Sequence, residues 1–190
     1  MTAFNTIASL VTEPHSAPVT HVGPRIAFTL ITVAVIALAV WGMKRSWVKK
    51  ARLFAHLPAP ISQAPEGTQW AAGPVEARFA GTTTTGQWLD RVVVHHLGTP
   101  RGVHVSVASS GVWLTDNADF NLWMPAQDIL AVRTGRGIAG DVVEPDGMIV
   151  LTWQLGETTL DSGIRVTRHA DHEEVLHELS QLVTQLEEMA

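Results

Sequence analysis

The chain of 190 residues contains no cysteine and no tyrosine, and only 16% of its residues are charged. The absence of cysteine excludes disulfides, cysteine-ligated zinc, iron–sulfur clusters and thiol nucleophiles. The small charged share, together with an apolar fraction of 46%, excludes a disordered chain and suffices for a hydrophobic core. The length predicts one compact domain with an appendage.

One long apolar run lies near the N-terminus, from Ile26 to Met43. It has 18 residues, of which 15 are apolar and none is charged. As a helix it would measure about 27 Å, close to the hydrocarbon thickness of a bilayer. A core helix would show a polar stripe, and a signal peptide would have a basic region before the run and a small-residue cleavage site after it. We therefore expect a retained transmembrane helix over residues 26–43.

A cluster of positive charge follows the apolar run, with no acidic residue inside it. Positive flanks stay on the cytoplasmic side, which predicts an outside N-terminal tail (residues 1–25) and a cytoplasmic C-terminal part at the plasma membrane. Two tryptophans bracket this boundary, where an indole ring suits the headgroup region. The cluster would also attract anionic lipids. The expected membrane-interface residues are Trp41, Lys44, Arg45, Trp47, Lys49, Lys50 and Arg52.

The segment that follows, up to residue 74, contains four prolines and no sustained periodicity. Proline fixes φ and disfavours helix in the residue before it. We call the positively charged cluster from Lys44 to Arg52 the basic foot. The basic foot and this proline-rich stretch, residues 44–74 together, are expected to tether a folded domain near the membrane.

From Val75 onward the apolar residues alternate with polar ones, as Val103, Val105 and Val107 do. This period of two is typical of strands, and turn residues separate the runs. The pattern predicts seven or eight antiparallel strands. They are residues 76–83, 91–96, 103–107, 111–115, 120–124, 129–134, 148–155 and 158–166.

The period changes near the C-terminus, where a helix is expected over residues 171–189. Asp171 is a good N-cap, and Glu174 can complete a capping box. Apolar residues then recur at spacings of three and four, which predicts one apolar face packed on the open end of the β structure.

Six segments together resemble a known family: Trp88–Arg91, Gly111–Leu114, Leu122–Pro125, Arg136–Gly140, Ile149–Trp153 and Leu160–Gly163. They are similar to actinobacterial single-span membrane proteins with a cytoplasmic pleckstrin-homology-like (PH-like) domain. The resemblance covers about Val75 to Leu182 and the span. It implies a mainly-β domain over residues 75–190, a bent sheet or barrel of about seven antiparallel strands capped by a C-terminal α-helix. Family members have no established activity and are often labelled export or transporter proteins.

Three sequence features bear on catalysis and cofactor binding. Residues 135–140 read G-x-G-x-x-G, but the segment beyond Gly140 leads into another strand-like run and leaves no room for the helix of a dinucleotide site. His169 and His172 have a spacing that would suit a metal-dependent enzyme or a ligand sensor, although solvated histidines at a helix start are commoner. No nucleophile elbow accompanies the serines. We therefore expect a non-enzymatic protein without a cofactor.

The charge of the domain distinguishes between binding of lipid headgroups, nucleic acids and proteins. Beyond Leu53 the chain has seven arginines, no lysine and 17 acidic residues, a net charge of −10. Phosphoinositides and nucleic acids need clustered positive charge, so lipid-headgroup binding is the lesser alternative and no nucleic-acid partner is expected. The sequence favours a membrane-anchored module that binds a cytoplasmic or membrane protein. The candidate surface is a strand edge or the long loop from Thr134 to Gly147. The candidate interaction-loop residues are Arg133, Arg136, Gly137, Gly140 and Asp141.

Overall fold

The computed structural model describes residues 22–189, and the chain divides into two compact units between Ser46 and Trp47. The described part of the first unit is helical and belongs to α1 (Val22–Leu53). Its segment Gly23–Ser46 is long and apolar enough to cross a membrane, and an 18-residue window within it has a mean hydropathy of 2.4 and no buried residue. The predicted span of residues 26–43 lies inside this segment. Most of the predicted N-terminal tail, residues 1–21, lies outside the described residues.

Two threonine hydroxyls inside the apolar segment are hydrogen-bonded to backbone carbonyls of the preceding helical turn. Thr29 Oγ1 donates to the Arg25 carbonyl and Thr32 Oγ1 to the Phe28 carbonyl, both at 2.9 Å. A hydroxyl bonded to the preceding helical turn needs no further partner in an apolar surrounding. The threonines therefore do not spoil the segment as a membrane span.

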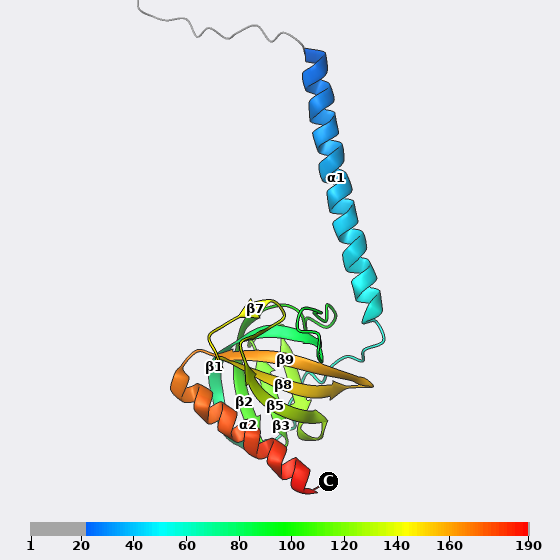
Figure 1. The fold of residues 1–190 in the computed structure, drawn as a ribbon. Helices are drawn as coiled ribbons and strands as arrows, with labels where there is room; N and C mark the ends of the chain where they lie inside the picture. The colour runs from blue at the N-terminus through cyan, green and yellow to red at the C-terminus, as the bar shows by residue number, and fades with distance from the viewer. Residues whose placement is uncertain (1–21, 190) are drawn as a thin grey trace, which may run out of the picture. The chain divides into compact units, whose positions relative to one another are not determined.

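The second unit is built on a seven-stranded antiparallel sheet whose spatial order is β4-β3-β2-β1-β9-β8-β5 (Figure 1). A short 3-10 helix, η1 (Ala126–Asp128), joins β4 to β5, and a separate hairpin of β6 (Gly137–Ile138) and β7 (Asp141–Val142) precedes β8. The predicted mainly-β architecture with a C-terminal helix is confirmed. The sheet strands are β1 (Trp70–Thr84), β2 (Arg101–Ala108), β3 (Gly111–Thr115), β4 (Asn121–Pro125), β5 (Ile129–Gly135), β8 (Met148–Leu155) and β9 (Thr158–Val166).

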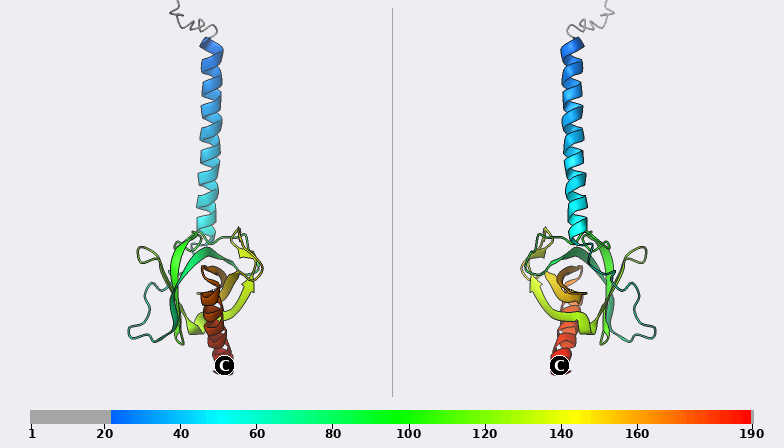
Figure 2. Two further views of the ribbon diagram at one scale, coloured as in Figure 1. Left: turned by 90° about the vertical axis from the view of Figure 1, so that its left-hand side faces the viewer. Right: turned by 90° about the vertical axis from the view of Figure 1, so that its right-hand side faces the viewer.

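Strand β1 gives the sheet its bend, because it pairs with a different neighbour along each half. Residues Trp70 to Phe79 pair with β2, and Ala77 to Thr84 pair with β9. The register shifts around Ala72 and between Phe79 and Gly81. Such irregularities increase local twist, so the sheet curls instead of lying flat (Figure 2).

Helix α2 (His169–Met189) covers the concave side of the curled sheet. Val175, Leu179 and Leu182 are buried in the main core, at the spacing that places them on one helical face. The helix begins two residues earlier than predicted. Asp171 therefore lies in the first turn, where it is ion-paired with Arg168 at 2.7 Å, and is not the N-cap.

Part of the proline-rich segment packs against the β domain. Phe54 and Leu57 are only 3% and 4% exposed and belong to the main core. The Trp123 amide donates to the Ile61 carbonyl at 2.8 Å, which adds Ile61 to the outer edge of β4. Burial of these apolar side chains holds this part of the segment on the domain.

The strand predicted over residues 91–96 does not form. Arg91 makes an isolated bridge to Thr83, and His95 and His96 have φ values of 53° and 61°. Two consecutive left-handed residues turn the chain, which ends any extended run. Leu97 is nevertheless fully buried, so the segment contributes to the core as a loop.

Asp116 organises the turn between β3 and β4. Its Oδ1 accepts the backbone N–H groups of Ala118 and Phe120 at 2.9 Å, and its Oδ2 lies 3.2 Å from Arg101 Nη1. The Arg101 guanidinium also lies 4.7 Å from the centre of the Phe120 ring. The two backbone N–H donors, helped by Arg101, lower the pKa of the Asp116 carboxyl.

We predict that Asp116→Ala lowers the free energy of unfolding of the β domain by about 1–3 kcal/mol near neutral pH. Because the folded-state pKa is lowered, this stabilisation is complete above the ordinary carboxyl pKa of about 3.9 and is lost as pH falls through the folded-state value. Denaturant unfolding of the full chain in detergent at several pH values measures it. The exposed Asp119→Ala is the matched control, and a loss that stays constant down to pH 2 would contradict the account.

Candidate functional site

The glycine-rich motif of the candidate loop builds the β6–β7 hairpin. Its turn residues Ala139 and Gly140 have φ values of 54° and 77°, as a two-residue type I′ turn requires. A Cβ atom on Gly137 would collide with the Asp141 carbonyl oxygen across the hairpin. The next residues after the turn form β7, not a helix. The motif therefore shapes a hairpin and offers no helix start for a pyrophosphate.

Ile138 fixes this hairpin to the convex side of the sheet. It is 1% exposed and packs in a second core with Ala80, Met148 and Val150. Met148 and Val150 alternate along β8 with residues of the main core, so the second core lies on the opposite face. A Cβ atom on Gly163 would overlap Ile138 Cγ2. Ile138 thus fills the space that a side chain at position 163 would occupy.

Arg91 fastens the hairpin turn to the loop after β1. Its Nε donates to the Ala139 carbonyl at 2.6 Å and its Nη1 to the Gly98 carbonyl at 3.0 Å. The Ala139 amide in turn donates to the Trp88 carbonyl at 2.7 Å. These bonds hold the backbone of the candidate loop in place.

The side chains of the candidate loop have separate roles. Arg133 Nη2 lies 3.0 Å from Asp161 Oδ2, and that buried carboxylate also accepts the Thr152 hydroxyl at 2.7 Å. Asp141 Oδ2 lies 3.1 Å from Arg78 Nε. Arg136 is exposed. The structure therefore uses Arg133 and Asp141 in ion pairs, and Arg136 projects from the loop.

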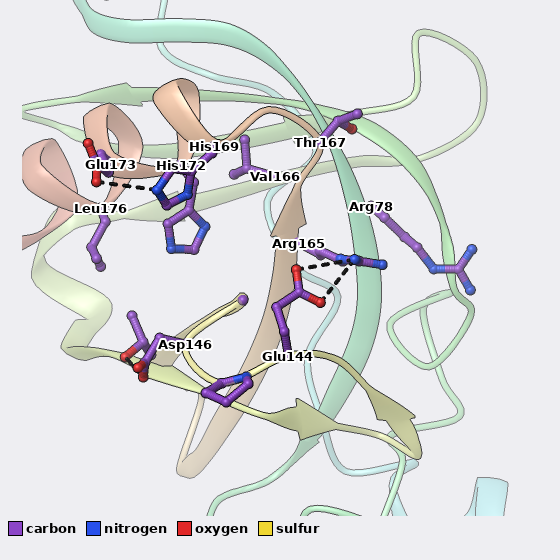
Figure 3. Close-up of a pocket in the computed structure, with 13 residues that line it drawn as sticks. Arg78, Glu144, Asp146, Arg165, Val166, Thr167, His169, His172, Glu173 and Leu176 are labelled. Carbon is purple, nitrogen blue, oxygen red and sulfur yellow. Dashed lines mark hydrogen bonds and ion pairs between the residues drawn. The ribbon is translucent and has the colours of Figure 1, made fainter.

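A cavity of about 780 Å³ lies between the start of α2, the end of β9 and the loop from β7 to β8 (Figure 3). This loop and the helix start were both singled out from the sequence, but as unrelated candidates. The hairpin brings the loop to the helix start, so the two form one site. The polar residues on its walls include Arg78, Thr134, Glu144, Asp146, Arg165 and His172.

The two predicted histidines differ in their surroundings. Both line the cavity, but the His169 side chain is 88% exposed and lies 3.5 Å from Glu173, whereas His172 is only 9% exposed. Their ring centres are 6.4 Å apart. Across residues 22–189, no three histidine or carboxylate side chains gather closely enough to hold a metal ion.

Arg165 and Glu144 form the charged centre of the cavity. Two bonds of 3.2 and 3.3 Å join Arg165 Nη2 to the Glu144 carboxylate (Figure 3). A hydrogen bond from the backbone of Glu144 itself, followed by Arg165, lowers the pKa of this carboxyl. Local sequence patterns predict no ion pair between the two residues, because one charge on a strand and one in a turn have no local signature.

Most arginines of the β domain form ion pairs or hydrogen bonds with other groups of the domain. Arg78, Arg101, Arg133, Arg165 and Arg168 are ion-paired with carboxylates. Arg91 is bonded to carbonyl groups. Of the described arginines beyond Leu53, Arg136 alone makes neither kind of contact.

The predicted membrane-interface residues lie on the C-terminal part of α1. Lys44, Arg45 and Lys49 are exposed, and the Arg45 guanidinium lies 5.6 Å from the centre of the Trp41 ring. This pairing of a cation with an indole suits the headgroup region. The side chains of Trp47, Lys50 and Arg52 lie outside the described residues.

Comparison with known protein families gives a match over most of the β domain. The family described as "Bacterial PH domain-like" matches residues 56–180, about two thirds of the chain. This range begins within the segment that packs on the sheet and ends within α2. No curated protein matches the chain.

We predict that Gly163→Ala destabilises the β domain by about 1–3 kcal/mol, because the new methyl group competes with Ile138 for one space. In an Ile138→Ala background the same change should cost at least about 1 kcal/mol less. Denaturant unfolding of the four chains gives this coupling. Gly102→Ala is the control, since a Cβ there meets no atom within 4 Å. Equal costs for Gly163→Ala in both backgrounds would contradict the Ile138 packing.

Proposed function

The chain belongs to the bacterial PH domain-like family, and on that premise we propose that it is a membrane-anchored, non-enzymatic module whose acidic domain binds a protein partner. The partner is a cytoplasmic protein or another subunit of a membrane assembly. The N-terminus lies outside the cell, α1 crosses the plasma membrane once, and the β domain lies in the cytoplasm.

This proposal rests on the observation that most arginines of the β domain are already bonded to other groups of the same domain. The domain beyond Leu53 has a net charge of −10, and six of its seven arginines are engaged in internal contacts. A phosphoinositide would need several cations at one place, and each of them would first have to leave its present partner. Protein surfaces with complementary charge make no such demand.

The anchor supports the same function. An exposed helix whose residues 26–43 include no charged side chain needs an apolar solvent, and its positive C-terminal flank favours the cytoplasmic side for the β domain. Restriction to the membrane surface raises the effective concentration of the domain toward partners there. A modest affinity would therefore suffice for association.

An alternative is a ligand- or metal-dependent enzyme or sensor at His169 and His172. One observation favours it, because His172 is largely buried and lies on the wall of a cavity. The cavity is also part of the surface that a protein partner would use, so His172 fits the leading proposal equally well.

We predict that a single cysteine introduced by Ser62→Cys reacts with a membrane-permeant maleimide in intact cells and not with an impermeant one. Ser62 is exposed, and the natural chain has no cysteine to compete. Permeabilised cells provide the control, where both reagents should react. Labelling by the impermeant reagent in intact cells would show that the orientation is the reverse of the proposed one.

We also predict that chemical crosslinking in intact cells, followed by mass spectrometry, recovers the same protein neighbour repeatedly through the β domain. A chain consisting of α1 and the basic foot alone is the control for proximity within the membrane. Recovery of no reproducible neighbour beyond that control would refute the binding of a protein partner.

A further inference from the structure

The two edges of the sheet are treated differently. At the β4 edge, the Trp123 amide already donates to Ile61, so the segment before β1 covers that edge at its middle. At the other edge, β5 pairs with β8 on one side and, among the described residues, with no strand on the other. An unpaired strand edge is a template for another extended chain.

The β5 edge is also accessible to solvent. Only Ile129 is buried, and Leu130 is 48% exposed although it is apolar. The regular pairing of Val132 to Gly135 with β8 keeps the strand extended. The edge is thus both preformed and open, which lowers the ordering cost of adding a strand.

The edge leads directly into the cavity. Thr134 is part of β5 and also lines the cavity, where its Oγ1 donates to Asp146 Oδ1 at 2.8 Å. Leu176 of α2 provides an apolar wall beside it. A peptide extended along β5 would therefore place a side chain in the cavity mouth.

The charges of the cavity select the kind of side chain. Both arginines on its wall are ion-paired, Arg165 with Glu144 and Arg78 with Asp141. Asp146 and Glu173 also line the cavity and have no arginine partner. With the domain strongly acidic overall, a cation is the complementary occupant.

We propose that an extended segment of the partner protein adds to β5 as a further strand and places a lysine or arginine in the cavity beside Asp146 and Glu173. This inference rests on the proposed function and specifies its partner site. Backbone hydrogen bonds along β5 would supply affinity, and the basic side chain would supply selectivity.

The test is a selection from a phage-displayed random-peptide library on the full chain in nanodiscs, with counter-selection on empty nanodiscs. Enriched peptides should share one lysine or arginine within an otherwise extended, non-proline pattern. Methylation of alternate backbone nitrogens in a synthetic copy should abolish binding in one of the two alternating sets and spare it in the other, as strand addition requires.

The double variant Asp146→Asn, Glu173→Gln should bind the selected peptide at least about tenfold more weakly. Asn keeps the acceptor for Thr134 and tolerates the positive φ of residue 146, so the fold is preserved. Asp119→Asn with Glu157→Gln is the matched control, since it removes the same charge from exposed positions elsewhere.

Failure to enrich any peptide, peptides without a basic residue, or equal binding by the two double variants would each overturn the inference. The proposed function would then still be decided by crosslinking in cells, because a partner can dock on another surface. Absence of a neighbour in cells would remove the proposed function itself.

Discussion

The contact between Ile138 and the bare backbone of Gly163 is the constraint on which the site depends. It pins the β6–β7 hairpin to the convex face of the sheet, and Arg91 holds the hairpin turn from the other side. Because the hairpin is pinned, the loop that follows is directed toward the start of α2, where Glu144 meets Arg165. The cavity lies between this loop and the start of α2.

The second determinant is the separation of charge along the chain. Positive residues are concentrated just after the apolar helix, whereas the β domain is acidic and binds most of its own arginines internally. The first property favours a particular orientation in a membrane, and the second leaves little positive charge for phosphate groups. On the proposed function, a PH-like fold beside a membrane binds a protein and not a lipid headgroup.

Local patterns predicted the elements that depend on local physics: the apolar helix, the alternating strands and the amphipathic C-terminal helix. They did not predict that Phe54 and Leu57 join the core, or that His95 and His96 turn the chain, since both outcomes depend on contacts with distant residues. The loop around Arg136 and the helix start at His172 were found separately. Their meeting around Arg165 follows from the packing of Ile138, which no local pattern reveals.

The central claim is that a protein partner covers the open β5 edge of the β domain in the cell. The natural chain has no cysteine, so the labelling rate of Leu130→Cys on the open edge of β5 shows whether a partner shields that edge. Gln185→Cys, at an exposed position on α2, is the reference. The account predicts that a permeant maleimide labels position 130 more slowly in cells than in the purified chain, while position 185 is unchanged. Equal relative rates in both settings would contradict it.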